Sequence, residues 1–203
     1  MQQVKETITQ IKTAEESSKE MVMATLTLAF SADPFNRWVF KDSETYLQLF
    51  PKFAYAFGGR ALSHSSAFHT EGYAGVSLWL PPKVEPDMET LVGLAETHIR
   101  EEIKEDAFSF FEQMDRAHPK EPCWYLPLLG VDPFRQNEGQ GSKLLRHALH
   151  MIDQEGMPAY LESSNPRNIP LYERFGFQVS GELKSGNSPS MYPMFRKPQK
   201  TKH

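Results

Sequence analysis

The chain has 203 residues, of which 39% are hydrophobic and 24% are charged, and its formal net charge is −4. This length fits one generous domain or two small ones, and the apolar bulk suffices for a folded core, which excludes disorder over most of the chain. The negative charge argues against general binding to nucleic acid or to an anionic membrane, which would require a basic face.

A single cysteine, Cys123, excludes an intrachain disulfide and any multi-cysteine metal or iron–sulfur site. Residues 1–16 place charges where a secretory signal needs an apolar segment. The longest uncharged stretch near them, residues 21–32, is much shorter than the roughly 18 apolar residues of a membrane span. We therefore expect a soluble protein of a reducing compartment, the cytoplasm.

The first half of the chain alternates amphipathic helices with short strands. Its predicted elements are a strand over Thr7–Ile11, helices over Glu15–Phe30 and Ser43–Phe57, a hairpin of strands over Ser65–Thr70 and Gly72–Leu80, and a helical region over Met88–Ala117 that breaks near Lys104–Asp106. Thr13 is available to cap the first helix, and Pro34 ends it. Gly58 and Gly59 close the second helix.

The second half alternates strands with helices, as in a mixed α/β domain. Trp124–Val131 is a nearly continuous apolar run, which indicates a strand buried on both faces. The elements predicted after it are a helix over Gly139–Gln154, a strand over Ala159–Ser163, a helical turn over Asn168–Phe175, and strands over Phe177–Leu183 and Met191–Arg196. No repeat or low-complexity linker divides the chain, so we expect one domain.

A glycine-rich loop joins the strand Trp124–Val131 to the next helix. Gly139 and Gly141 permit positive φ and a close ligand, and the first helical turn offers unpaired N–H groups at the positive end of the helix dipole. Such a site suits a pyrophosphate, although a lone Gly-x-Gly also occurs at helix starts that bind nothing. The Walker A spacing is absent, and Leu144 stands where a Rossmann loop has its third glycine.

Two motifs, taken together and in order, resemble the GNAT acetyltransferase superfamily. Gln136–Gly141 matches the pattern Q/R-x-x-G-x-G/A, and Leu171–Phe177 matches the terminal pattern LYxxxGF. Within the superfamily, residues 118–198 are most similar to the puromycin N-acetyltransferases. The resemblance implies a GNAT fold of the α/β class, in which a central, mostly antiparallel sheet has splayed parallel fourth and fifth strands and is flanked by helices.

The resemblance also implies that acetyl-coenzyme A lies between the splayed strands Trp124–Val131 and Ala159–Ser163, with its pyrophosphate on the loop amides. The backbone of Leu129 and Val131 would pair with the pantetheine arm as an added strand would. The cofactor-binding residues implied in this way are Leu128, Leu129, Val131, Gln136, Asn137, Glu138, Gly139, Gln140, Gly141, Ser142, Asn165, Asn168 and Tyr172.

Pro127 interrupts the strand that would hold the cofactor. A proline in a central strand is tolerated only at an edge, a bulge or a break in pairing, and the splay of a GNAT sheet is such a break. Because Pro127 has no N–H, we expect the Leu128 amide to polarise the thioester carbonyl. Asn165 is expected to contact the pantetheine arm and Asn168 to cap the last helix, although the two could exchange roles.

Two residues are the candidate catalytic groups. In the matched LYxxxGF motif, Tyr172 is expected to be the general acid that protonates the departing thiolate; the alternative is a tyrosine that only packs the helix against the sheet. Glu162, at the end of its strand, is expected to bind the ammonium group and take its proton, directly or through water; the alternative is a solvated or salt-bridged glutamate. His64 and His69 are other candidate bases. Cys123 is interpreted as structural.

The acceptor side is expected to use Asp33, Phe35 and Trp79, whereas most other aromatic residues of the first helices belong to the core. His147 and His150 lie one helical turn apart but lack a third ligand, so no metal is expected. Residues 1–120 would form mainly the acceptor side of a single domain, residues 121–198 the acetyl-coenzyme A side, and residues 199–203 a tail.

The sequence therefore predicts an N-acetyltransferase that moves an acetyl group from acetyl-coenzyme A to the primary amine of a small molecule, an antibiotic-like compound being one candidate, by direct attack in a ternary complex. An acetyltransferase that acts on a protein N-terminus or lysine is one alternative, and a non-catalytic acyl-coenzyme A sensor is another. The expected assembly is a monomer or a homodimer, with neither nucleic acid nor membrane as a partner.

Overall fold

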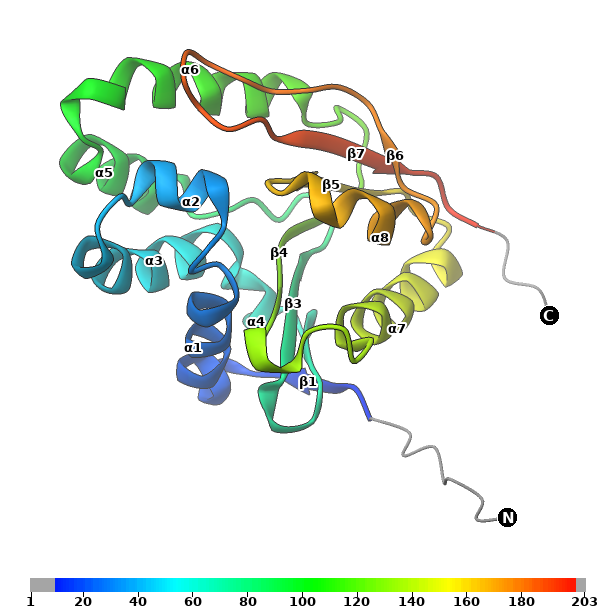
Figure 1. Ribbon diagram of the computed structural model, residues 1–203. Helices are drawn as coiled ribbons and strands as arrows, with labels where there is room; N and C mark the ends of the chain where they lie inside the picture. Colours follow the sequence, from blue (N-terminus) through cyan, green and yellow to red (C-terminus); the bar gives the residue numbers. More distant parts are fainter. Residues whose placement is uncertain (1–9, 200–203) are drawn as a thin grey trace.

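The computed structural model describes residues 10–199. A single twisted sheet runs through these residues, and helices cover both of its faces (Figure 1). Its seven strands lie in the order β1-β2-β3-β4-β5-β7-β6. All neighbouring strands are antiparallel except β4 and β5, which are parallel. The predicted mixed α/β sheet with parallel fourth and fifth strands is confirmed.

Helices α1 to α6 precede β4 in the chain, α7 connects β4 to β5, and α8 lies between β5 and β6. The strands are β1 Lys12–Ala14, β2 Ala67–His69, β3 Gly75–Leu80, β4 Trp124–Val131, β5 Ala159–Ser163, β6 Gln178–Val179 and β7 Tyr192–Arg196. The helices are α1 Lys19–Ala29, α2 Pro34–Val39, α3 Ser43–Gly58, α4 Arg60–Ser63, α5 Met88–His98, α6 Glu101–Ala117, α7 Gln140–Gln154 and α8 Ile169–Glu173. Four 3₁₀ turns are η1 Glu16–Ser18, η2 Glu71–Tyr73, η3 Pro133–Arg135 and η4 Pro166–Asn168.

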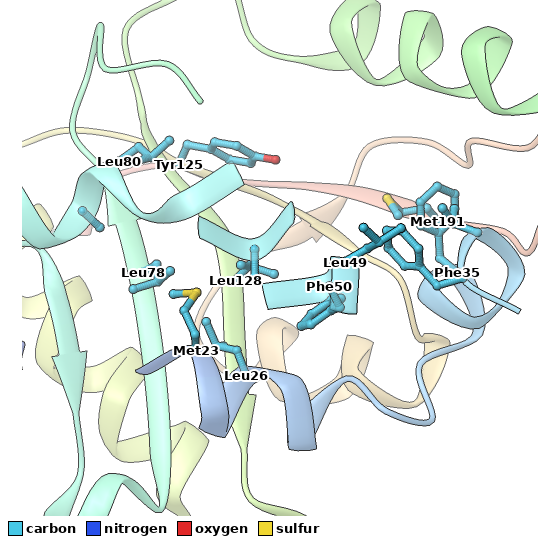
Figure 2. Packing of buried hydrophobic residues seen from close by; sticks show 14 of the residues in the cluster. Met23, Leu26, Phe35, Leu49, Phe50, Leu78, Leu80, Tyr125, Leu128 and Met191 are labelled. Carbon is cyan, nitrogen blue, oxygen red and sulfur yellow. The ribbon is translucent and has the colours of Figure 1, made fainter. Parts of the chain in front are cut away.

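Two hydrophobic cores lie on opposite faces of the sheet. The first core packs α1, α2, α3, α5 and α6 against the sheet, and Figure 2 shows its central side chains, among them Leu26, Phe50 and Leu78. The second core packs α7 and α8 against the other face. Because strand residues alternate between faces, Leu78 and Leu80 enter the first core and Trp79 between them enters the second.

Gly130 in β4 lets α1 approach the sheet closely. A Cβ atom at this position would lie 2.8 Å from Cβ of Ala29 and 3.0 Å from Cδ2 of Leu26. Contacts of this length do not occur between real side chains, so only glycine fits without moving the helix. The close approach anchors α1 against the strand that borders the candidate site.

Several predicted boundaries differ from the structure at the start of the chain. Residues 7–9 of the predicted strand Thr7–Ile11 lie outside the described residues, and the strand that the structure contains is Lys12–Ala14. Thr13 therefore lies in β1 and does not cap a helix. Pro34 follows the end of α1 as expected, but it also begins α2, where Asp33 accepts a hydrogen bond from the Asn36 amide.

The break between α5 and α6 falls at Ile99 and Arg100, not near Lys104–Asp106. Ile99 is extended at the end of α5, and Glu101 then begins α6. The acidic side chains in the first turn of α6 interact favourably with the positive end of its helix dipole. The predicted strand Phe177–Leu183 is also wrong in extent. It shortens to Gln178–Val179, and Leu183 makes only an isolated bridge to Met191.

Candidate active site

The parallel pairing of β4 with β5 is brief. Trp124 is paired with Ala159 and Tyr125 with Tyr160, and the pairing ends there, although β4 continues to Val131. Beyond this point the two strands leave a seam between their facing edges. The carboxyl end of β5, which carries Glu162, borders the seam.

A β-bulge lies where the seam opens. On the other side of β4, Leu128 is opposite Leu78 and Tyr125 is opposite Leu80, so two β4 residues oppose Trp79. One of these two residues is Pro127, which has no N–H to donate to a ladder. The expectation that Pro127 occupies a bulge or a break in pairing is confirmed.

The register determines which backbone groups of β4 face the seam. The Asp132 amide donates to the Ala74 carbonyl at 2.9 Å, and hydrogen-bonded pairs alternate along an antiparallel ladder. Leu128 therefore falls in a hydrogen-bonding pair with β3. Leu129 and Val131 turn their N–H and C=O groups away from β3, toward the seam. This register agrees with the backbone pairing expected of Leu129 and Val131, but it does not support a free Leu128 amide.

The loop between β4 and α7 contains the other predicted cofactor residues. Asn137 and Gly139 have φ values of 65° and 75°, in the left-handed region that glycine and asparagine tolerate best. The exposed loop leads into the N-terminus of α7, a helix of 15 residues. The expected loop residues are Gln136, Asn137, Glu138, Gly139, Gln140, Gly141 and Ser142.

The Glu138 carboxylate of this loop is compensated by a neighbouring arginine. Arg135 Nε donates to Glu138 Oε2 at 2.8 Å, and this contact holds the pKa of Glu138 below its ordinary value. Gln140 is buried, and its Oε1 atom has no hydrogen-bond partner. A Cβ atom at Gly141 would make only ordinary contacts, the nearest at 3.5 Å from Leu129 Cδ2. An alanine side chain would therefore fit at position 141.

Tyr172 lies on α8 and is buried in the second core, where its ring and that of Phe177 make an edge contact at a centroid distance of 6.1 Å. Burial, and then the negative charge of Asp33, raise the pKa of Tyr172, so its hydroxyl keeps its proton at neutral pH. Of the two asparagines, Asn165 accepts a hydrogen bond from the Arg167 amide through its side chain, whereas Asn168 makes no side-chain cap. Asn165 therefore caps η4, and Asn168 occupies the N-cap position of α8 without the side-chain hydrogen bond that was predicted.

Glu162 lies beside two tyrosines that the sequence analysis did not single out. The Tyr125 hydroxyl donates to Glu162 Oε2 at 2.8 Å. Burial raises the pKa of Glu162 to about 7, and the hydroxyls of Tyr125 and Tyr160 offset part of that rise. A partly buried carboxyl that titrates near neutrality is suited to take up a proton and release it again.

The predicted acceptor-side residues are packed into the protein. Trp79 is fully buried in the second core, on the face opposite α3, so it cannot line an acceptor pocket beside α3. Phe35 packs on Phe110 at a ring-centroid distance of 4.5 Å. Asp33 accepts hydrogen bonds from the backbone and side chain of Asn36 and, at 2.6 Å, from Ser164 Oγ. Asp33 thereby ties the start of α2 to the end of β5.

The other polar candidates lie apart from the seam or are unreactive. His69 stacks on Tyr73 at 4.0 Å on β2, with β3 between it and β4. His147 packs its ring on Phe68. Burial raises the pKa of Cys123 to about 11, so it stays a thiol. Within residues 10–199, no three histidine, cysteine, aspartate or glutamate side chains are grouped to hold a metal ion.

A seam between two parallel strands, with a helix N-terminus at its end and a carboxyl beside it, is an arrangement suited to an extended phosphate-bearing ligand. The sequence profile described as the Acetyltransferase (GNAT) family matches residues 37–177. The chain belongs to this family. None of the helices within residues 10–199 is both long and apolar enough to cross a membrane.

Individual relatives are similar over different extents. A curated relative, an uncharacterized N-acetyltransferase of Schizosaccharomyces pombe, is 48% identical over 54 residues, which are 27% of this chain and 22% of the relative. A Corynebacterium glutamicum protein named histone acetyltransferase HPA2 and related acetyltransferase has the same fold, with a TM-score of 0.68 and 22% identity over 96% of this chain and 99% of its own. The polyamine N-acetyltransferase of Drosophila melanogaster has a TM-score of 0.65 and 13% identity over 93% and 99%.

Proposed function

We propose that the protein transfers the acetyl group of acetyl-coenzyme A to the primary amine of a small molecule, by direct attack in a ternary complex. The observation that carries this proposal is the position of Glu162 at the end of β5, beside the seam where the pairing with β4 stops. The carboxyl titrates near pH 7 because it is buried. Such a carboxylate can act as a general base when a nucleophile that carries a proton, such as an ammonium group, enters the seam.

The residues around the seam fit an extended thioester ligand. Free backbone groups of Leu129 and Val131 would hold its pantetheine arm, and the N-terminal amides of α7 would hold its pyrophosphate. When bound, acetyl-coenzyme A supplies the acetyl group as a thioester. Because Leu128 is paired with β3, the Leu129 amide is our candidate donor to the thioester carbonyl oxygen.

Two side chains would move the protons. Glu162 takes a proton from the ammonium group of the acceptor, which frees the nitrogen lone pair for attack. Tyr172, whose raised pKa keeps it protonated, gives a proton to the departing thiolate. Most of the rate would come from holding the amine and the thioester together in one site. Residues 1–120 would supply most of the acceptor side, and residues 121–198 the acetyl-coenzyme A side.

The acceptor class rests on similarity. Structural neighbours carry the names arylalkylamine N-acetyltransferase and polyamine N-acetyltransferase, which makes small amines the first candidates. The resemblance of residues 118–198 to the puromycin N-acetyltransferases adds aminonucleoside antibiotics as candidates. The net charge of −4 also favours a cationic acceptor.

A thiol-release assay with acetyl-coenzyme A tests the proposal. The panel contains 2-phenylethylamine, spermidine, agmatine, puromycin and a peptide with a free N-terminus. We expect thiol release with at least one small amine, and mass spectrometry should show a single added acetyl group on that amine. Release only with the peptide would contradict the small-molecule acceptor, and coenzyme A binding without release from any amine would favour a sensor.

A further inference from the structure

The two tyrosines beside Glu162 are both buried, but only one of them is hydrogen-bonded. Tyr160 is 1% exposed, and its hydroxyl forms no well-directed hydrogen bond although it lies near enough to Glu162 to lower the pKa of that carboxyl, whereas Tyr125 donates to Glu162. A buried hydroxyl without a partner costs free energy of folding, and phenylalanine at the same position would avoid that cost. A buried polar group without a hydrogen bond needs an explanation, and a role in catalysis is one explanation.

The register explains how the three side chains meet. Tyr125 and Tyr160 form the last pair of the parallel ladder, with ring centroids 5.9 Å apart and planes inclined at 33°. Glu162 is two residues beyond Tyr160, so both side chains project from the same face of β5. The three side chains therefore stand together where β4 and β5 separate.

Few other titratable groups surround this cluster. The His118 ring packs edge-on against both tyrosines, at 4.9 Å from Tyr125 and 4.8 Å from Tyr160, and burial lowers its pKa, so it is neutral at pH 7. Cys123, at the start of β4, remains a thiol. Among the described residues, no lysine or arginine contributes to the pKa of Glu162. The two tyrosine hydroxyls are therefore the main polar groups that act on the carboxyl.

We propose that Tyr125 and Tyr160 are positioning residues for the Glu162 base: Tyr125 fixes one carboxyl oxygen, and the Tyr160 hydroxyl serves the other oxygen in both of its protonation states. A hydroxyl can donate one hydrogen bond and accept others. It donates to the carboxylate before proton transfer and accepts from the carboxylic acid afterwards. In the protein alone, this hydroxyl lies near the carboxyl but is not yet aligned on either oxygen.

The proton transfer balances as follows. One N–H bond of the acceptor ammonium breaks, its electron pair stays on nitrogen, and the proton forms an O–H bond with the oxygen of Glu162 that Tyr125 does not hold. The Tyr160 hydroxyl then rotates from donor to acceptor. Tyr125 stays protonated throughout, because burial and the Glu162 charge keep its pKa well above 10.

The first experiment replaces each tyrosine with phenylalanine and follows the Glu162 carboxyl by carbon-13 NMR, which needs no acceptor. Tyr125→Phe removes a hydrogen bond that favours the charged form, so the pKa of Glu162 should rise by about one pH unit. Tyr160→Phe should shift that pKa less, because its hydroxyl serves both forms. Tyr46→Phe is the matched control: it removes another buried hydroxyl, which donates to the Thr27 carbonyl at 2.7 Å, and should leave Glu162 unchanged.

The second experiment measures turnover and thermal unfolding of the full-length variants. Tyr160→Phe should lower kcat about tenfold without lowering Tm, because it removes a buried hydroxyl that has no partner. A purely structural role would change Tm and leave kcat intact. In a Glu162→Gln background, neither tyrosine substitution should lower kcat further, since both act through the carboxyl.

The outcomes separate this inference from the proposed function on which it rests. An unshifted Glu162 pKa in Tyr125→Phe overturns the role of Tyr125, and an unchanged kcat in Tyr160→Phe overturns that of Tyr160, whatever the acceptor. If Glu162→Gln itself leaves turnover intact, the base assignment fails and the positioning roles fail with it. If the tyrosine variants alone have no effect while Glu162→Gln does, the proposed function stands and the positioning roles are wrong.

Discussion

Replacing Glu162 with glutamine removes the proposed base and keeps the size of the side chain. An amide oxygen can still accept a hydrogen bond from the Tyr125 hydroxyl, but the side chain cannot take up a proton. The pKa of Glu162 is raised by burial to about 7. The charged form therefore makes up about one tenth of the molecules near pH 6 and about nine tenths near pH 8. Wild-type kcat/KM should rise about tenfold over this range, since only the carboxylate can accept the ammonium proton.

The Glu162→Gln variant should lose about 100-fold in kcat near pH 8 and should lose the rise with pH. Its affinity for coenzyme A, measured by calorimetry, should be unchanged, because the glutamine lies outside the loop that would hold the pyrophosphate. Thiol release measured across this pH range gives both parameters. If the variant keeps a rise with the same midpoint, another group is the base. His118 would place that midpoint below 6.5, because burial lowers its pKa.

Three further substitutions test two other parts of the site and one buried ion pair of the fold, between Asp153 on α7 and Arg196 on β7. Tyr172→Phe should lower kcat about 100-fold in the thiol-release assay and leave coenzyme A binding intact, and equal turnover would remove Tyr172 as the acid. Gly139→Ala strains a residue with a φ of 75°, so unfolding by urea should show a loss of about 1 kcal/mol, and coenzyme A should bind more weakly. Asp153→Asn leaves the buried Arg196 guanidinium, held at 2.7 Å, without its counter-charge, and should cost about 3 kcal/mol in the same unfolding experiment; a loss below about 1 kcal/mol would contradict this.

The sequence predicts best those elements whose hydrophobic pattern has a single interpretation. Trp124–Val131 is found with the predicted bounds, because a strand covered by helices on both faces is almost continuously apolar. Ala159–Ser163 also has the predicted bounds, although it ends in the polar residues Glu162 and Ser163. Trp79 shows where this signal fails. When every residue of a strand is buried, as in β3, the sequence does not say which residues face which layer, so Trp79 was expected on the acceptor side although it packs in the second core.

The geometry of the site depends on the register of β4 with its neighbouring strands, which cannot be read from a single sequence. Motif spacing locates the loop at Gln136–Gly141 and brings Glu162 to the seam. Tyr125 reaches the site because β4 pairs with β5 at Tyr125 and Tyr160. This pairing lets the Tyr125 hydroxyl donate to the Glu162 carboxyl, which is 37 positions away in the sequence. Whether the Leu128 or the Leu129 amide faces the seam depends on the bulge at Pro127. The bulge adds one residue to β4 and so shifts by one position which backbone amides bond to β3.

The burial that makes Glu162 a useful base should also make it costly to the fold. Its pKa in the folded protein, about 7, lies above the 4.5 of an exposed glutamate. The folded state therefore holds the proton more tightly than the unfolded state, so the cost is absent below about pH 4.5 and complete above about pH 7, where it amounts to about 3 kcal/mol. Glu162→Gln should consequently unfold at a higher urea concentration than the wild type near pH 8 and at about the same concentration near pH 4. A variant that is less stable at both pH values would show that the carboxyl is retained for packing. Greater stability near pH 8 combined with lost turnover would show that it is retained for catalysis at the expense of the fold.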